Sequence, residues 1–283
     1  MDPENTMSKN KPSHGASAVV TGAGSGIGRA FALELARRGG RVVCSDINPD
    51  SAAETAQLIK AAGGQAWSAA CDVRSLESMQ LLAGVALAEL GQAPDLVINN
   101  AGIGAGGRRI GEFGIEDWQA TIDVNLWGVI HGCHVFVPLL RRRGHGGILN
   151  VASTASFAAA PKMGAYNVTK AAVLALTETL AAELADTGVR VSALCPTFVK
   201  TNIVRDGRID DGTSRMAAQL MSWTGVSADG VARTALDGLD RGQLYVLPQL
   251  DARMVWRFKR YAPASYARGA GLVGRLMDLA QRV

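Results

Sequence analysis

Three residues of the chain have the types and spacing needed to move a proton to or from an oxygen atom. Tyr166 and Lys170 stand four positions apart in YNVTK, so a helix over this segment places both on one face. Ser153 precedes the tyrosine by 13 residues. A phenol acts as an acid or base near neutral pH if its pKa falls from about 10, and a neighbouring ammonium group favours that fall. The trio predicts proton transfer at an alcohol or carbonyl oxygen, although Tyr166 alone could equally be an aromatic residue packed on the core.

A glycine-rich turn, TGAGSGIGRA, follows an apolar run near the start of the chain. Its glycines fit the spacing G-x-x-x-G-x-G at Gly22, Gly26 and Gly28, and they do not fit the commoner dinucleotide pattern G-x-G-x-x-G. Glycine lets a phosphate approach backbone amides at the positive end of a helix. The turn, with Ser25 and Ile27 inside it, therefore predicts a pyrophosphate site, although many loops carry glycines for steric reasons alone.

A carboxylate stands at the position where a ribose-binding acid is expected. Asp46 ends the apolar run RVVCSD about 20 residues beyond the glycine turn. A 2′-phosphate would set its charge against this carboxylate, so NAD is expected as the cofactor and NADP is disfavoured. Arg29, in the first turn of the predicted helix, is a cation that could reach a phosphate instead. Taken alone, Asp46 could also be a turn residue or a helix cap.

Seven short apolar runs alternate with segments of helical spacing, and these runs are the predicted strands. They cover residues 17–21, 41–45, 65–70, 95–98, 147–151, 189–194 and 243–247. Strands that are buried on both faces and separated by helices form a parallel sheet. The predicted fold class is α/β: a doubly wound, parallel, seven-stranded Rossmann sheet with helices on both faces and a ligand at the carboxyl ends of its strands.

Residues suited to ligand binding directly follow four of these strands. The third strand is followed by Asp72 and Val73, the fourth by NNAG (residues 99–102), the fifth by Ser153 and the sixth by PTFVKT (residues 196–201). All of them fall at one edge of the predicted sheet, the edge where a ligand is expected.

The composition is typical of one folded domain with short appendages. With 283 residues and 48% hydrophobic content, the chain can bury a sizeable core over residues 16–250. Residues 1–15 are polar, lack the apolar part of a secretory signal and are predicted to be disordered. Four cysteines without a C-x-x-C pair indicate reduced core residues of a cytoplasmic protein. The histidines form no convincing metal site, and no apolar run reaches the roughly 18 residues of a membrane span.

The order of these motifs resembles that of the short-chain dehydrogenase/reductase family, in its compact single-domain branch. The resemblance covers roughly residues 16–247 and adds Asn125, in VNLWG, to the residues above. Thr197 departs from the glycine that the family often has there, and Ala152 and Ser156 vary its usual serine stretch. The resemblance implies hydride transfer between a nicotinamide cofactor and a carbinol or carbonyl carbon.

The resemblance also implies a role for each matching residue. Tyr166 is the expected acid/base, Lys170 also holds the nicotinamide ribose, Ser153 hydrogen-bonds the substrate oxygen and Asn125 anchors a water relay. Asp72 and Val73 are expected at the adenine, and Asn99 could instead only fix the end of its strand. The expected cofactor-binding residues are Gly22, Ser25, Gly26, Ile27, Gly28, Asp46, Asp72, Val73, Asn99, Ala101, Gly102, Tyr166, Lys170, Pro196 and, at the carboxamide, Thr201.

The expected substrate is a small apolar secondary alcohol or ketone. Ser153, Phe157, Tyr166 and Phe198 are expected to contact it, and the apolar residues among the 30 or so that follow Pro196 predict a mobile lid. A 3-oxoacyl thioester reductase is the rival enzyme, and it would favour NADPH. A regulatory protein that binds a dinucleotide without catalysis is a third hypothesis, which the intact catalytic set disfavours.

Two surfaces are expected to make contacts beyond the substrate. Family members pair through helices that match roughly residues 116–141 and 164–186, so a homo-oligomer, a dimer or tetramer, is expected unless these faces only cover the sheet. The tail, residues 251–283, is predicted to form a basic amphipathic helical extension that Pro263 interrupts. Its seven cations and two acids give the tail a net charge of +5. Because the net charge of the whole chain is +4, the residues before the tail have a net charge of −1. Nucleic acid is not an expected partner; the tail is predicted to pack on a neighbouring subunit or over the pocket, or else to contact an anionic membrane surface weakly.

Overall fold

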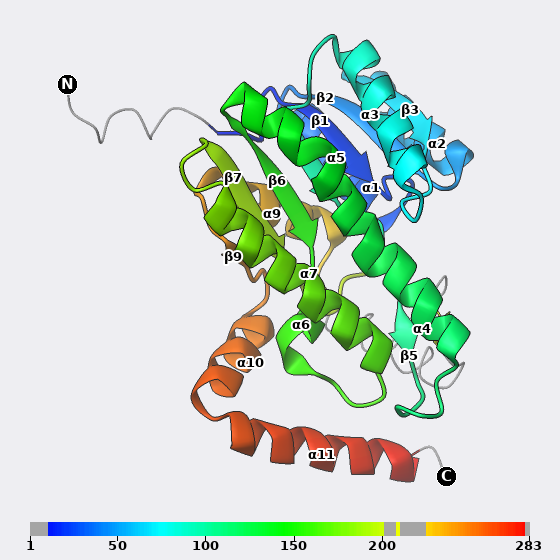
Figure 1. Ribbon diagram of the computed structural model, residues 1–283, viewed down its shortest axis with the longest axis vertical. Helices are drawn as coiled ribbons and strands as arrows, with labels where there is room; N and C mark the ends of the chain where they lie inside the picture. The colour runs from blue at the N-terminus through cyan, green and yellow to red at the C-terminus, as the bar shows by residue number, and fades with distance from the viewer. Residues whose placement is uncertain (1–10, 201–207, 210–224, 281–283) are drawn as a thin grey trace, which may run out of the picture.

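The computed structural model describes residues 11–200, 208–209 and 225–280, and its centre is a parallel sheet (Figure 1). The strand order is β3-β2-β1-β4-β6-β7-β9, and every neighbouring pair is parallel. The strands are β1 (Ser17–Thr21), β2 (Arg41–Asp46), β3 (Gln65–Ala70), β4 (Leu96–Asn99), β6 (Gly146–Val151), β7 (Val189–Leu194) and β9 (Tyr245–Val246). The predicted doubly wound, seven-stranded sheet is confirmed.

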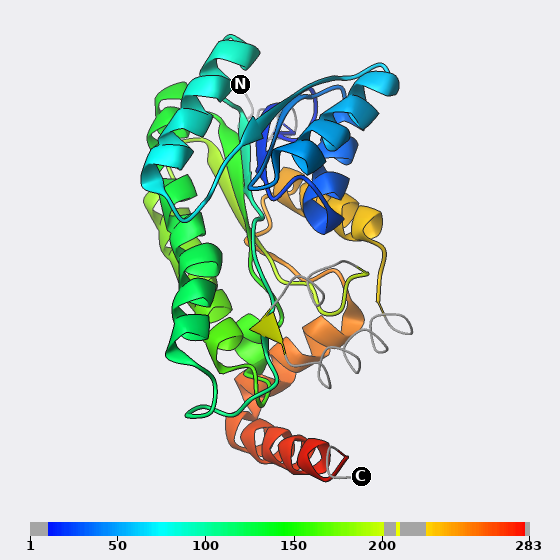
Figure 2. The ribbon, with the colours of Figure 1, turned by 90° about the vertical axis from the view of Figure 1, so that its right-hand side faces the viewer.

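Helices cover both faces of the sheet, as Figure 2 shows edge-on. One face carries α1 (Gly26–Arg37), α2 (Pro49–Ala61) and α9 (Ala228–Asp240), whose buried residues join one apolar cluster. The other carries α3 (Leu76–Leu90), α5 (Gly128–Arg143) and α7 (Gly164–Glu183), which form a second cluster. Because strands with both faces buried expose only their ends, polar ligands can reach the sheet only there.

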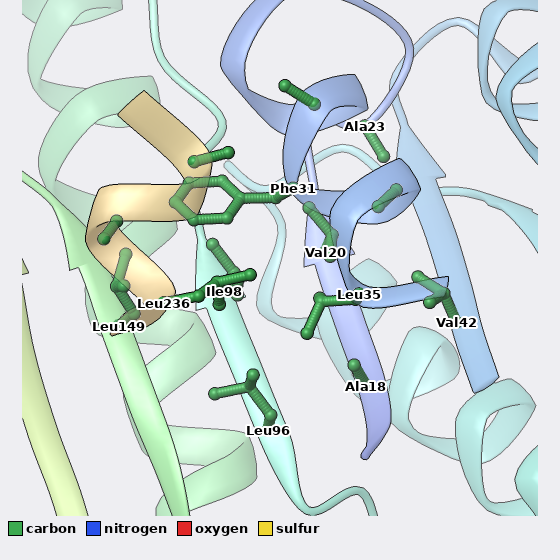
Figure 3. Packing of buried hydrophobic residues seen from close by; sticks show 14 of the residues in the cluster. Ala18, Val20, Ala23, Phe31, Leu35, Val42, Leu96, Ile98, Leu149 and Leu236 are labelled. Carbon is green, nitrogen blue, oxygen red and sulfur yellow. The ribbon is translucent and has the colours of Figure 1, made fainter. Parts of the chain in front are cut away.

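Phe31 shows how the first cluster fixes the glycine turn. This fully buried ring of α1 lies beside Leu236 of α9 and above Val20 and Ile98 of the central strands (Figure 3). Burial of a side chain of this size stabilises the fold by about 1.5–3 kcal/mol. Since Phe31 stands one turn beyond Gly28, this packing also holds the start of α1 against the sheet.

One long helical run lies between β4 and β6. It consists of α4 (Ile115–Ile122), a π-helical turn η2 (Asp123–Trp127) and α5. Among the described residues, this run of Ile115–Arg143 is long and apolar enough to cross a membrane by length and composition. The sequence-based expectation concerned unbroken apolar runs and not the mean hydropathy of a helix; the inner side of α5 packs on the sheet through Val129, Phe136 and Leu140.

The tail forms two helices, as predicted. The first, α10 (Leu250–Tyr261), ends just before Pro263, and the second, α11 (Pro263–Ala280), begins at that proline. Both lie beyond the carboxyl ends of the strands, at the same end of the molecule as α6 (Ala155–Ala158) in both views (Figures 1 and 2). A two-stranded sheet of β5 (Ala105–Gly106) and β8 (Arg208–Ile209), which the sequence pattern did not predict, lies at this end as well.

Candidate active site

The glycine turn after β1 leaves no room for a side chain at Gly22, Gly24 or Gly28. A Cβ at Gly28 would overlap the carbonyl oxygen of Gly22 and stand 2.5 Å from Asn100 Nδ2. Gly22 has a φ of +64°, and a Cβ there would lie 2.9 Å from Ala101 Cα. Ser25, the residue before α1, makes no side-chain cap, so the first amides of the helix are free of side-chain acceptors. The cradle therefore fits a pyrophosphate at the helix N-terminus.

Asp46 is bonded to the same turn. Its Oδ2 accepts a hydrogen bond from Gly24 N at 2.9 Å, and its Oδ1 accepts one from Asn48 N at 3.0 Å. Arg29, the cation that could have reached a phosphate, donates to Gly24 O at 2.6 Å and pairs with Glu54 at 2.5 Å. The rim of the turn thus combines a carboxylate with an arginine that is already neutralised.

The two asparagines of NNAG face opposite ways. Asn99 is 2% exposed and donates to Asn150 Oδ1 at 2.8 Å, inside the core. Asn100 donates instead to the carbonyl oxygens of Thr21 and Gly22, at 2.9 and 3.2 Å. The side chain of Asn100 therefore ties β4 to the glycine turn, a role that the sequence analysis did not assign, whereas Asn99 can meet a cofactor only through its backbone.

Asn125 holds the loop that follows NNAG. It lies fully buried in the π-helical turn, where its Oδ1 accepts from Ile103 N at 2.7 Å and its Nδ2 donates to Ile103 O at 2.9 Å. A Cβ on Gly102 would stand 3.1 Å from Asn125 Oδ1 and 3.4 Å from Lys170 Nζ. Gly102 thus marks the point where the fourth strand's loop, the π-helix and α7 converge.

Ser153, Tyr166 and Lys170 meet at the end of β6. Lys170 is 2% exposed, donates to Val151 O at 2.8 Å and lies over the Tyr166 ring, 5.8 Å from its centroid. The Ser153 side chain lies close enough to the Tyr166 hydroxyl to affect its pKa. Ser156, which sequence reasoning noted only as a variation, accepts from Ser153 N at 3.3 Å and donates to Lys170 O at 2.7 Å. It thereby links the serine loop to α7.

The pKa values of the pair are set by burial. Burial lowers the pKa of Lys170 from 10.5 to about 8. Burial also raises the pKa of Tyr166, and the Ser153 side chain acts in the opposite direction. This differs from the lowering expected from Lys170, because loss of hydration penalises a phenolate and the ammonium group faces the ring and Val151 O.

The remaining predicted cofactor residues lie along the same edge. Asp72 is paired with Arg74 at 2.6 Å, which holds its pKa below the usual range, and Val73 packs beneath Gly128 of α5. Pro196 is buried, and its carbonyl oxygen accepts from Thr154 N at 2.9 Å. Most of the residues expected at the carboxamide and in the lid lie outside the described residues: Thr201, Ile203, Val204, Met216, Leu220, Met221 and Trp223.

The two aromatic residues expected at the substrate occupy different settings. Phe157, in α6, is partly buried and packs against the cluster of α3, α5 and α7. Phe198 is 40% exposed, and its carbonyl oxygen accepts from Val226 N and Gln249 Nε2. Both stand on segments that the tail contacts.

The C-terminal segment from Gln249 onward is bonded to the loops on either side of the reaction centre. Gln249 Oε1 accepts from Thr197 N at 3.2 Å, and Asp251 accepts from the Thr197 hydroxyl at 3.2 Å. Tyr266 donates its hydroxyl proton to Ala158 O at 2.8 Å, at the end of α6. Thr197, which departs from the family's usual glycine, thus has a hydroxyl partner that the sequence pattern did not show.

Fold and site together define the class: an α/β protein with a dinucleotide cradle beside a buried Ser, Tyr and Lys. A family model described as short chain dehydrogenase matches residues 16–211. The chain belongs to the short-chain dehydrogenase/reductase family of oxidoreductases, as its motif order predicted.

Relatives of known sequence differ in how much of their length the chain matches. Oxidoreductase EphD of Mycobacterium tuberculosis is 40% identical over 80% of this chain, which spans only 35% of that relative. The 1-deoxy-11-beta-hydroxypentalenate dehydrogenase of Streptomyces exfoliatus is 34% identical, over 88% of this chain and 91% of its own. Cyclohexanol dehydrogenase of an Acinetobacter species is 38% identical, over 67% and 75%.

Solved structures agree with the fold and include both cofactor types. A Burkholderia phymatum short-chain dehydrogenase/reductase in complex with NAD has a TM-score of 0.81 and 34% identity, covering 86% of this chain and 92% of that one. A Thermococcus sibiricus alcohol dehydrogenase in complex with 5-hydroxy-NADP has a TM-score of 0.70 and 28% identity, covering 81% and 94%.

Proposed function

We propose that the protein transfers a hydride between a nicotinamide cofactor and a small apolar secondary alcohol or ketone, with Tyr166 as general acid and base. The observation that carries this proposal is a chain of neighbours beside the glycine cradle: Asn125 and Lys170 meet at Gly102, Lys170 lies over the Tyr166 ring, and Ser153 is next to Tyr166. A set of this kind has no use in a protein that only binds a dinucleotide. Turnover by purified protein on a panel of alcohols and ketones, with either cofactor, tests it.

In this proposal each buried side chain has a separate task. The bound nicotinamide supplies or accepts the hydride. Ser153 orients the substrate oxygen, and Tyr166, whose raised pKa keeps it protonated near neutral pH, donates its proton to the oxygen of a ketone undergoing reduction. In the reverse direction the phenolate of Tyr166 accepts the proton of the alcohol. Asn125, by holding the loop at Ile103, keeps Gly102 beside Lys170.

We infer that NAD is the preferred cofactor. Asp46 presents its carboxylate at the turn, and Arg29 is occupied by Glu54 and Gly24 O. A 2′-phosphate would therefore meet a negative charge with no free cation from this turn. We expect kcat/KM with NAD to be at least about tenfold higher than kcat/KM with NADP. The variant Asp46→Ala should reduce this ratio. A tenfold preference of the unmodified protein for NADP would contradict the inference.

The apolar substrate is supported by the site and by two relatives. Phe157 and Phe198 stand on the segments that flank Ser153 and Tyr166. The relatives are named for cyclohexanol and for a hydroxypentalenate, so alicyclic alcohols are the first compounds to assay. The rival function, reduction of a 3-oxoacyl thioester, predicts turnover of acyl thioesters with NADPH and none of cyclohexanol.

A homo-oligomer is proposed on the side of α5 and α7. Trp127, at the start of this side, is 47% exposed and Val168 of α7 is 51% exposed, so apolar area remains for a second copy. Light scattering at micromolar concentration should give a dimer or tetramer, and a monomer would contradict the proposal.

A further inference from the structure

The outer side of α10 carries an apolar stripe that the rest of the described chain covers only in part, at Phe258, whose ring meets that of Tyr266 on α11 with centroids 6.1 Å apart. Leu250, Met254, Phe258 and Tyr261 follow one another at intervals of four, four and three residues, which places them along one side of the helix. Their side chains are 74%, 70%, 52% and 85% exposed. The helix therefore turns apolar residues both inward, to α6, and outward.

Cations border this stripe. At about 100° per residue, three arginines of α10 fall next to the stripe on one side, and α11 adds two more that are exposed. The tail's own acid at the start of α10, Asp251, is engaged by Thr197. The exposed arginines are Arg253, Arg257, Arg260, Arg268 and Arg275.

The same end of the molecule has further exposed apolar residues. Leu272 and Val273 of α11 are 58% and 52% exposed. Ile110, in the loop that leads into α4, is 78% exposed, and Ile115, the first residue of α4, is 81% exposed; the loop lies at this end in both views (Figures 1 and 2). The apolar surface is thus broader than one helix.

We propose that this basic face of α10 and α11 docks on an anionic membrane surface. An apolar stripe bordered by cations is the pattern of a helix that lies in the lipid interface. A second copy of the chain is a less suitable partner for two reasons. A symmetric contact would place the arginines of one copy against those of the other. The rest of the chain has a net charge of only −1, which offers little attraction to a tail with a net charge of +5. Docking would turn the loops that hold Ser153 and Thr197 toward the lipid.

Sedimentation of the full chain with lipid vesicles tests the proposal. The protein should sediment with vesicles of phosphatidylglycerol and phosphatidylcholine, and should stay in solution with phosphatidylcholine alone. Binding should weaken as salt rises, because exposed charges are screened over about 10 Å at 0.1 M salt. Equal sedimentation with both vesicle types, or none with either, overturns the proposal.

Matched pairs of variants distinguish binding through the tail from attraction by the net charge of the whole protein. Arg257→Glu with Arg268→Glu should weaken vesicle binding by about tenfold or more, whereas Lys60→Glu with Arg241→Glu, the same change of charge on exposed body residues, should leave it nearly unchanged. An equal loss in both pairs would show attraction to net charge alone and overturn the docking face.

An apolar pair of variants tests the stripe itself. Met254→Ser should weaken binding about threefold or more, and Leu81→Ser, at 66% exposure on α3, should not. If Met254→Ser instead abolishes a concentration-dependent dimer and leaves vesicle binding intact, the face binds a second copy and the membrane proposal fails.

Discussion

The cofactor half and the substrate half of the cleft are held in different ways. In the cofactor half, backbone packs on backbone: Gly28 lies against Gly22 O, and Ala23 N donates to Ser45 O at 2.8 Å. In the substrate half, side chains reach from the distant C-terminal segment: Gln249 and Asp251 hold Thr197, and Tyr266 holds the end of α6.

This difference separates a fixed task from an adjustable one. Backbone contacts of the glycine turn tolerate almost no substitution at Gly22, Gly24 or Gly28, because a Cβ added at any of these three positions would overlap its neighbours. Side-chain contacts between loops and tail can change one residue at a time. The cofactor half is therefore suited to one ligand type, and the substrate half to a pocket that varies between relatives.

The largest expected effect is at the junction of the two halves. Tyr166→Phe removes only the hydroxyl and should lower kcat by about 10³-fold, the size of a general acid–base contribution. Cofactor affinity, measured by fluorescence titration, should stay within about threefold, since the backbone cradle is unchanged. A variant that keeps a large share of its turnover would falsify the assigned role of Tyr166.

Burial of Lys170 should make the stability of the fold depend on pH. A pKa lowered from 10.5 to about 8 corresponds to about 3 kcal/mol of destabilisation of the charged form. Below pH 8 both states hold the proton and the whole cost is present. Between about pH 8 and 10.5 only the unfolded chain holds it, so stability rises with pH.

The comparison of Lys170→Met with the unmodified protein isolates this effect. Urea unfolding should show the variant more stable near pH 7.5, with the difference shrinking by about 3 kcal/mol as the pH approaches 10.5. Lys60→Met, at an exposed site, should show no such trend. A difference that does not vary with pH would contradict a charged, buried Lys170.

Gly28→Ala tests the claim that the cofactor half depends on backbone contact. The new Cβ would overlap Gly22 O, and overpacking of about 2 kcal/mol corresponds to about thirtyfold weaker cofactor binding. Gly84→Ala is the matched control, because nothing lies within 4 Å of its Cβ and it stands on the exposed side of α3. Equal cofactor affinities in the two variants would mean that the backbone of the turn can shift to accommodate a Cβ at Gly28.

The two halves also differ in how far the sequence predicts them. The seven strands and the glycine turn follow from local patterns, because apolar runs and glycine spacing are read over a few residues. The contact of Gln249 with Thr197 joins positions 52 residues apart, and no local pattern shows it. The opposite directions of Asn99 and Asn100 depend on the pleat at the end of β4, so the motif NNAG alone cannot say which side chain meets the turn.

Replacement of Gln249 should have the smallest effect of these variants and should distinguish the substrate half of the cleft most clearly from the cofactor half. Its side chain is 9% exposed, its Oε1 accepts from Thr197 N, and its Nε2 donates to Phe198 O at 3.4 Å. In Gln249→Ala the amide of Thr197 loses its partner, and a loss of about 1 kcal/mol corresponds to about a fivefold higher KM for an apolar substrate.

Cofactor affinity should not change in Gln249→Ala, because the glycine cradle has no contact with this side chain. Gln92→Ala is the control: Gln92 also makes a side-chain bond, to Ser17 Oγ at 3.1 Å, but at the opposite end of the sheet, so KM should keep its value. A change in cofactor affinity equal to that in KM would mean that the tail supports the whole cleft. Since side-chain bonds of this kind contribute only about 1 kcal/mol each, replacing them one at a time would alter the substrate half gradually while the cofactor half kept its function.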